Sequence, residues 1–128
     1  MTIASLSVVI PVYGSATILP DLVKRLAPVL EVFGDQKELI FVCDDSPDNA
    51  WEVIKELRET HAWIRGIRLM RNFGQHGALL CGIRAARFDV ICTMDDDLQH
   101  PPEALPLLWD ALVPGTDVVY GPPEREQH

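Results

Sequence analysis

Short apolar runs rich in valine and isoleucine recur along the chain, separated by longer stretches in which polar and apolar positions mix. They occupy residues 6–10, 38–43, 66–70, 89–94 and 117–120. Their length and β-branched content are typical of strands that are buried on both faces of a parallel sheet. We therefore expect one sheet built from these runs, with the intervening stretches as its connections.

The stretches between the runs carry apolar residues at helical spacing. The first helix is expected to begin after Thr17 as its N-cap, with Pro28 bending or shortening it. The second is expected after Ser46 as N-cap, with Pro47 at the first helical position. Further helices are expected over 78–87 and 103–112. Helical crossovers between buried strands define an α/β fold: a doubly wound, mostly parallel sheet, Rossmann-like, with helices on both faces.

Length and composition narrow the class of protein. The 128 residues fit one domain, 1–128, and the net charge of −8 argues against a nucleic-acid partner. Cys43, Cys81 and Cys92 lie in apolar surroundings without CxxC spacing, which predicts free thiols in a reducing compartment. No apolar stretch approaches the roughly 20 residues that span a bilayer. The N-terminus lacks the basic region of a signal peptide.

Acidic residues follow two of the expected strands. Asp95, Asp96 and Asp97 come directly after the fourth apolar run, and Asp44 and Asp45 come after the second. In a sheet with strand order 3-2-1-4, both loops border the crevice beside the end of the first strand. Three adjacent carboxylates repel one another unless cations or hydrogen-bond donors compensate. A hard divalent cation, Mg²⁺ or Mn²⁺, that chelates a nucleotide diphosphate is the simplest compensation.

Other phosphate-binding and signalling patterns are missing. No GxGxxG follows a strand and no GxxxxGK[ST] occurs, so phosphate neutralisation is left to the metal, aided by Arg71. A nucleotidyltransferase needs a lysine in the loop after the first strand, and residues 14–17 lack one. A signalling receiver domain needs acids after the first strand and a lysine after the fifth, but neither is present. For Asp48 we expect helix capping alone.

Four segments, taken together and in this order, resemble the family 2 glycosyltransferases of GT-A fold. They are residues 8–13, 41–46, 71–76 and 94–103. The similarity is greatest to the polyprenyl-phosphate glycosyltransferases related to dolichol-phosphate mannose synthase, and it covers nearly the whole chain. The stretch 94–103, which reads MDDDLQHPPE, is its most specific signal.

The resemblance implies a site for a nucleotide-diphospho-sugar donor, either UDP- or GDP-linked. The residues implied to lie at the donor nucleotide are Pro11, Val12, Tyr13, Asp44, Asp45, Arg71, Asp95 and Asp96. Asp97, with Asp95 as a second candidate, is implied to bind the divalent metal. The implied reaction is sugar transfer with inversion to a polyprenyl phosphate lipid, or to a polysaccharide or other acceptor. The metal assists the leaving diphosphate, and either a carboxylate base deprotonates an acceptor hydroxyl or a phosphate acceptor attacks directly.

The sequence departs from the family pattern at three points. Gly14 and Ser15 stand where Asn-Glu is usual, Asp96 stands where a small residue is common, and Ser46-Pro47 replaces the usual Gly-Ser. The first departure puts one usual polar contact of that loop in doubt. The second adds a carboxylate that either faces solvent or offers an alternative metal ligand.

Length is the largest departure. In the enzymes that the chain resembles, the acceptor-binding half, the catalytic base and any membrane helices follow the region where residue 128 lies. The resemblance therefore implies a donor-binding half that is truncated at its C-terminal end, with the base beyond residue 128 and little turnover alone. A non-catalytic nucleotide-sugar-binding module is the alternative. We also expect a role in cell-envelope glycan synthesis, a cytoplasmic location at the membrane face when full length, and a possible homodimer.

Overall fold

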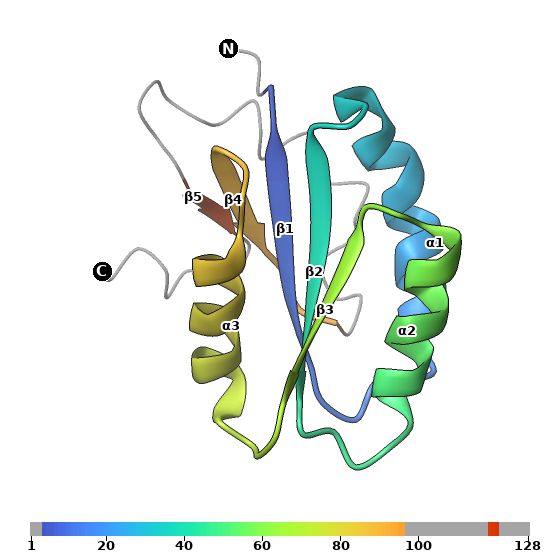
Figure 1. Cartoon of the computed structure of the whole chain (residues 1–128), viewed down its shortest axis with the longest axis vertical. Helices are drawn as coiled ribbons and strands as arrows, with labels where there is room; N and C mark the ends of the chain where they lie inside the picture. The colour runs from blue at the N-terminus through green and yellow to red at the C-terminus, as the bar shows by residue number, and fades with distance from the viewer. Residues whose placement is uncertain (1–3, 97–117, 121–128) are drawn as a thin grey trace.

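A parallel sheet with helices on both faces forms the protein (Figure 1). The computed structural model describes residues 4–96 and 118–120. The strands are β1 (Leu6–Val12), β2 (Lys37–Asp44), β3 (Ile64–Leu69), β4 (Val90–Thr93) and β5 (Val118–Tyr120). They lie in the order β3-β2-β1-β4-β5, and every neighbouring pair is parallel. The expected doubly wound α/β fold and the expected strand order are confirmed.

Three α-helices and one short 3-10 helix connect the described strands. They are α1 (Leu19–Leu30), η1 (Glu31–Phe33), α2 (Ala50–Thr60) and α3 (Gly74–Ala85). Helices α1 and α2 cover one face of the sheet and α3 covers the other (Figure 1). The helix expected over 103–112 lies outside the described residues. None of the helices within 4–96 is long and apolar enough to cross a membrane.

The starts of two helices differ from expectation. Thr17 does not cap α1, whose N-cap residue is Ile18 without a side-chain hydrogen bond, and α2 begins four residues after Ser46. The Ser46 hydroxyl instead accepts the Gly14 N–H at 2.8 Å and donates to Asp48 at 2.5 Å. The prediction of Ser46 as an N-cap was therefore wrong, because this side chain joins two loops and does not cap the first turn of α2.

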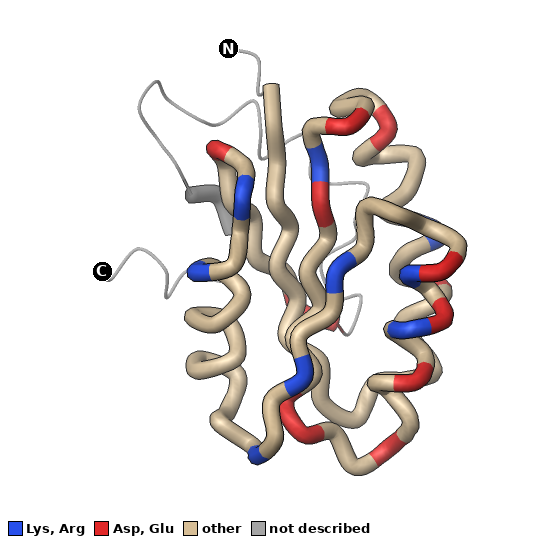
Figure 2. Tube along the Cα trace, viewed as in Figure 1, with Lys and Arg blue, Asp and Glu red and all other residues tan. Residues whose placement is uncertain are grey.

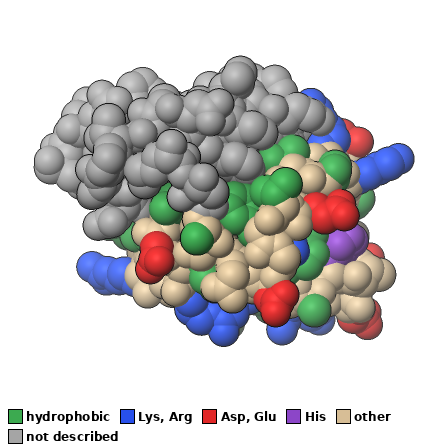
Figure 3. Space-filling model, turned by 90° about the horizontal axis from the view of Figure 1, so that it is seen from above, with side chains coloured by type: hydrophobic (Ala, Val, Ile, Leu, Met, Phe, Trp, Pro, Cys, Tyr) green, Lys and Arg blue, Asp and Glu red, His purple; other side chains and the backbone are tan. Residues whose placement is uncertain are grey.

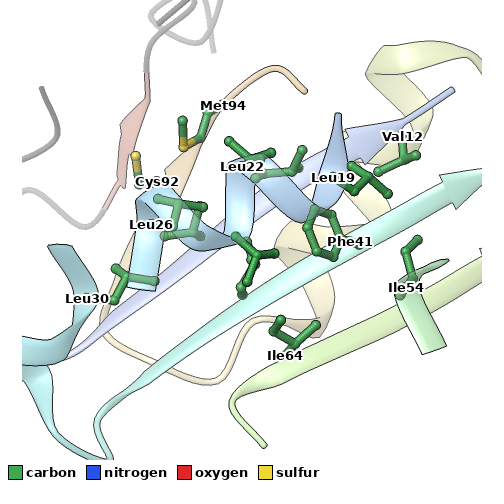
Figure 4. Packing of buried hydrophobic residues seen from close by; sticks show 14 of the residues in the cluster. Val12, Leu19, Leu22, Leu26, Leu30, Phe41, Ile54, Ile64, Cys92 and Met94 are labelled. Atoms are coloured by element: carbon green, nitrogen blue, oxygen red, sulfur yellow. The ribbon is translucent and has the colours of Figure 1, made fainter. Parts of the chain in front are cut away.

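Side chains of β1 alternate between two hydrophobic cores. Leu6, Val8 and Ile10 point to the face covered by α1 and α2, where residues of α1 pack over Phe41 of β2 (Figure 4). Val9 points to the opposite face and packs with residues of β2 and α3. Burial on both faces explains why the strands read as continuous apolar runs. The two cores also hold the strand ends in place, and these ends position the loops that follow each strand.

A buried carboxylate joins the strands near their amino ends. Glu38 is 1% exposed, and it accepts hydrogen bonds from Ser7 Oγ and from the backbone N–H of Arg87, both at 2.7 Å. Arg65 adds an ion pair at 2.7 Å. Burial raises the pKa of Glu38, but the hydrogen bonds from Ser7, Arg87 and Arg65 outweigh it and leave the pKa lowered. Figure 3 views the molecule from this end, where charges of both signs are scattered over the surface.

Candidate functional site

The loops that follow β1, β2, β3 and β4 meet at the carboxyl edge of the sheet and enclose a cleft of about 330 Å³. The described residues that line it are Pro11, Val12, Tyr13, Asp44, Asn72, Gly74, Gln75, Asp95 and Asp96. The cleft lies beside β1, where the strand order reverses, because β2 and β3 lie on one side of β1 and β4 lies on the other. Open α/β sheets bind ligands at such a point. Figure 2 shows acidic residues in the loops at this end.

Asp44 lies at the end of β2 and lines the cleft. Its side chain is buried, with 3% of the residue exposed, and Oδ1 accepts the backbone N–H of Phe73 at 2.7 Å. The Asn72 amide donates to the backbone carbonyl of Asp44 at 3.4 Å. These contacts tie the loop after β3 to the end of β2. Asp45 is exposed, has a φ of 53° and is not among the described residues that line the cleft.

The first two carboxylates of the acidic triplet are held by different elements. Asp95 Oδ1 accepts a hydrogen bond at 2.6 Å from Gln75 Nε2, in the first turn of α3. Asp96 Oδ2 accepts one from the Ser15 hydroxyl and a longer one, at 3.4 Å, from the backbone N–H of Tyr13. Asp95 is therefore hydrogen-bonded to α3, whereas Asp96 is hydrogen-bonded to the loop after β1.

Asp48 joins the loop after β1 to the start of α2. Its Oδ2 accepts the Ala16 N–H at 3.0 Å, and its Oδ1 accepts the Ala50 N–H at 3.2 Å and the Ser46 hydroxyl. Slight burial raises the pKa of Asp48, but these hydrogen bonds outweigh it and leave the pKa lowered. The expected contact with a helix start is present, but a bridge to a second loop accompanies it.

Residues at the start of α3 line the cleft although the sequence did not single them out. The helix begins at Gly74, four residues before the expected start at residue 78. Asn72 Oδ1 accepts the Gly74 N–H at 2.9 Å, and Gly74 has a φ of 83°, which favours glycine. The Asn-x-Gly spacing was the available signal for this turn. It brings Gln75 within reach of Asp95.

Arg71 lies beside the cleft. Its guanidinium carbon is 4.7 Å from the centroid of the Phe73 ring, a distance typical of a cation–π contact. Both side chains are exposed, and neither belongs to the described residues that line the cleft. The structure thus places Arg71 in the loop after β3, with its guanidinium over the Phe73 ring.

Among the described residues, few side chains at the cleft could bind a metal ion. No group of three His, Cys, Asp or Glu side chains positioned to hold a metal ion occurs within 4–96 or 118–120. Asp97, expected to bind the metal, lies outside these residues. Asp95 and Asp96 bring carboxylate oxygens to the cleft, and these are the ligands that Mg²⁺ and Mn²⁺ prefer. The chemistry of the donor set at the cleft therefore fits a hard divalent cation.

The doubly wound parallel sheet, with an acidic cleft at its carboxyl edge beside the first strand, has the GT-A fold, which the solved structures described below share. The comparison with protein families specifies the class further. The model for glycosyl transferase family 2 matches residues 7–127. The chain belongs to this family.

Curated relatives share about two residues in five with the chain. It is 39% identical over 119 residues to the undecaprenyl-phosphate 4-deoxy-4-formamido-L-arabinose transferase of Edwardsiella ictaluri. The matched region covers 92% of this chain and 37% of the relative. The chain is 40% identical over 118 residues to the transferase of the same name from Salmonella paratyphi B, covering 91% of this chain and 36% of the relative. The chain thus spans little more than a third of the length of these relatives.

Solved structures share the fold at lower identity. The mannosyltransferase PcManGT from Pyrobaculum calidifontis, in complex with GDP-Man and Mn²⁺, superposes with a TM-score of 0.69 at 19% identity, over 76% of this chain and 28% of that one. TarS 1-349 from S. aureus, in complex with UDP-GlcNAc, superposes with a TM-score of 0.64 at 22% identity, over 73% and 26% of the two chains.

Proposed function

We propose that this chain is the donor-binding part of a glycosyltransferase that transfers a sugar, with inversion, from a nucleotide diphosphate to a polyprenyl phosphate lipid. The observation that carries the proposal is the acidic cleft at the carboxyl edge of the sheet, with Tyr13, Asp44 and Asp95 in its wall. Membership of glycosyl transferase family 2 supports the reaction class. The names of the undecaprenyl-phosphate transferases support the acceptor.

In this proposal the nucleotide base lies against the end of β1. Pro11, Val12 and Tyr13 border it, and the Tyr13 side chain is available because the residue is 55% exposed. Asp44 accepts a hydrogen bond from the base, and the Phe73 N–H fixes the carboxylate for this role. Uracil and guanine both carry a ring N–H donor, so this contact alone suits either base. Asp45 supports the loop.

The diphosphate is proposed to lie near Asp95 and Asp96. Carboxylates repel a diphosphate, so a divalent cation between them is needed for both to occupy one cleft. Asp97, with Asp95 as the second candidate, would hold Mg²⁺ or Mn²⁺, and when bound the cation would assist departure of the diphosphate as a Lewis acid. The neighbouring structure that holds GDP-Man together with Mn²⁺ supports this arrangement. Arg71 is proposed to add positive charge near the nucleotide.

A cytoplasmic location is proposed with this function, at the membrane face where a lipid acceptor is met. The free thiols of Cys43, Cys81 and Cys92 suit a reducing compartment. A homodimer stays a prediction, which sedimentation of the purified chain tests.

Calorimetric titration of the chain with UDP and with GDP, with and without Mn²⁺, tests the proposed function. We expect binding of one nucleotide that depends on Mn²⁺. Asp44→Asn, which replaces a charged acceptor, is expected to weaken binding about tenfold, and Asp97→Ala is expected to remove the dependence on metal. Asp21→Asn, at an exposed position in α1, serves as the matched control. Binding of neither nucleotide by a chain with a native circular dichroism spectrum would contradict the proposal.

A further inference from the structure

One carboxylate oxygen links two loops of the cleft that are far apart in sequence. Asp96 Oδ2 accepts hydrogen bonds from the Ser15 hydroxyl and the Tyr13 N–H, across separations of 81 and 83 residues. Ser15 is buried, with 7% of its surface exposed, and it is not among the described residues that line the cleft. Ser15 can therefore influence a ligand in the cleft only through the residues that it holds.

The held segment carries the aromatic side chain at the cleft wall. Tyr13 is 55% exposed and follows directly after β1. The next residue, Gly14, has a φ of 70°, so the chain turns sharply immediately after Tyr13. Hydrogen bonds from Tyr13 to Asp96, from Gly14 to Ser46 Oγ and from Ala16 to Asp48 connect this turn to the rest of the site. The bonds to Asp96 bear most directly on Tyr13, because one of them comes from its own N–H.

The two neighbouring acids differ in what holds them. The bond to Asp95 comes from a long side chain, Gln75, whereas Asp96 Oδ2 receives a hydroxyl and a backbone N–H. Ligation of a cation by that oxygen would have to replace the hydrogen bond from the buried Ser15 hydroxyl and the longer one, at 3.4 Å, from the Tyr13 N–H. An exchange of this kind disfavours Asp96 Oδ2 as a ligand and favours it as a fixed acceptor.

We infer that Asp96 and Ser15 form a positioning pair, which holds Tyr13 at the cleft for the nucleotide base, and that Asp96 acts as a hydrogen-bond acceptor rather than as a charge. The inference rests on the proposed donor site. It assigns different roles to adjacent carboxylates: the negative charge of Asp95 serves the metal and diphosphate, and the acceptor oxygen of Asp96 serves the loop.

Nucleotide titrations of the full 128-residue chain test the pair. Ser15→Ala and Asp96→Ala are each expected to raise the Kd for the bound nucleotide about fivefold. The double variant is expected to match the single variants within about twofold, because Asp96→Ala already removes the contact that Ser15→Ala breaks. Asp96→Asn keeps an acceptor oxygen and is expected to bind within about twofold of wild type. Asp95→Asn removes the charge and is expected to lose far more. Ser15→Thr, which keeps the hydroxyl, is expected to restore binding.

Measuring the free energy of unfolding alongside the Kd distinguishes a positioning role of Ser15 and Asp96 from a general effect on the fold. Ser5→Ala is the matched control, because Ser5 is also 7% exposed and accepts one backbone N–H, from Asp89, at the amino end of the sheet. It is expected to lower the free energy of unfolding without changing the Kd for the nucleotide.

Three results would overturn the inference. Additive effects of Ser15→Ala and Asp96→Ala would show that the two side chains act independently. Loss of binding in Asp96→Asn equal to that in Asp95→Asn would assign Asp96 a charged role. A wild-type chain that binds neither UDP nor GDP would overturn the donor site and the positioning role together, and the first two results, obtained with a binding wild type, would overturn only the positioning role.

Discussion

At the scale of single residues, two departures from the family pattern contact each other. Ser15 and Asp96 are unusual when each is considered alone, since one places a short hydroxyl where Glu is usual and the other adds a carboxylate. In the structure they share a hydrogen bond across 81 residues of sequence. The order of the strands predicts that both lie near the crevice. Their pairing could not be predicted, because it depends on how the turn at Gly14 directs the next side chain.

Glu38 shows what a single buried charge contributes. Its pKa is lowered in the folded state because hydrogen bonds and Arg65 outweigh burial. The carboxylate therefore stabilises the fold at pH values above its ordinary pKa of 4.5, and this contribution is lost as the pH falls through the lower folded value. Glu38→Gln is expected to reduce the free energy of unfolding by about 2 kcal/mol at neutral pH, and by progressively less in acid.

Urea denaturation of wild type and Glu38→Gln over a range of pH measures this difference. Glu56→Gln, at an exposed position in α2, is the control and is expected to change the free energy of unfolding by no more than about 0.5 kcal/mol. A difference between wild type and Glu38→Gln that stays constant down to pH 3 would contradict the role assigned to the Glu38 charge.

At the scale of elements, the strands were predictable and the helix starts were not. Burial on both faces gives continuous apolar runs, which mark each strand to within about two residues. The start of a helix depends on which polar side chain is free to cap it. Ser46 does not cap α2, because its hydroxyl is hydrogen-bonded to Gly14 and Asp48. The first turn of α3 was missed because its small and polar residues carry no apolar periodicity. Gln75 was missed with it.

The approach of α3 to the sheet depends on Gly82. A Cβ at this position would lie 2.3 Å from Val9 Cγ1 and 3.0 Å from Val42 Cγ2. Gly82→Ala is therefore expected to lower the free energy of unfolding by about 2 kcal/mol, even though alanine is intrinsically the better helix former. Thermal or urea unfolding of the purified variant provides the measurement.

Two further variants make this prediction specific to the contact. Gly77→Ala in the same helix would meet only Phe73, whose Cβ lies 3.0 Å away, a much less severe contact than the 2.3 Å at Gly82, so a change of less than about 1 kcal/mol is expected. Val9→Ala makes room for the added methyl group, so the double variant with Gly82→Ala is expected to be more stable than the separate losses imply. Strict additivity would mean that Gly82 does not set the distance between α3 and the sheet.

At the scale of the whole molecule, the two ends of the sheet differ in what their side chains do: those at the amino end stabilise the fold, and those at the carboxyl end form the cleft. Glu38 and its partners join the strands at the amino end, and the carboxyl end carries loops that are bonded to one another and to the end of β2. The strand order and the positions of the acids made the acidic cleft at this end predictable. The individual bonds between the loops were not predictable, because each joins residues from different connections.

The most direct test of the donor site is a map of where the nucleotide binds. We would record amide NMR spectra of the nitrogen-15-labelled chain with Mg²⁺, before and after saturation with the nucleotide that binds more tightly. We expect the largest shifts at Val12, Tyr13, Gln75 and Asp95, around the cleft. Shifts gathered instead at Trp63 and Phe88, which line a hollow of about 510 Å³ at the opposite end of the sheet, would contradict it.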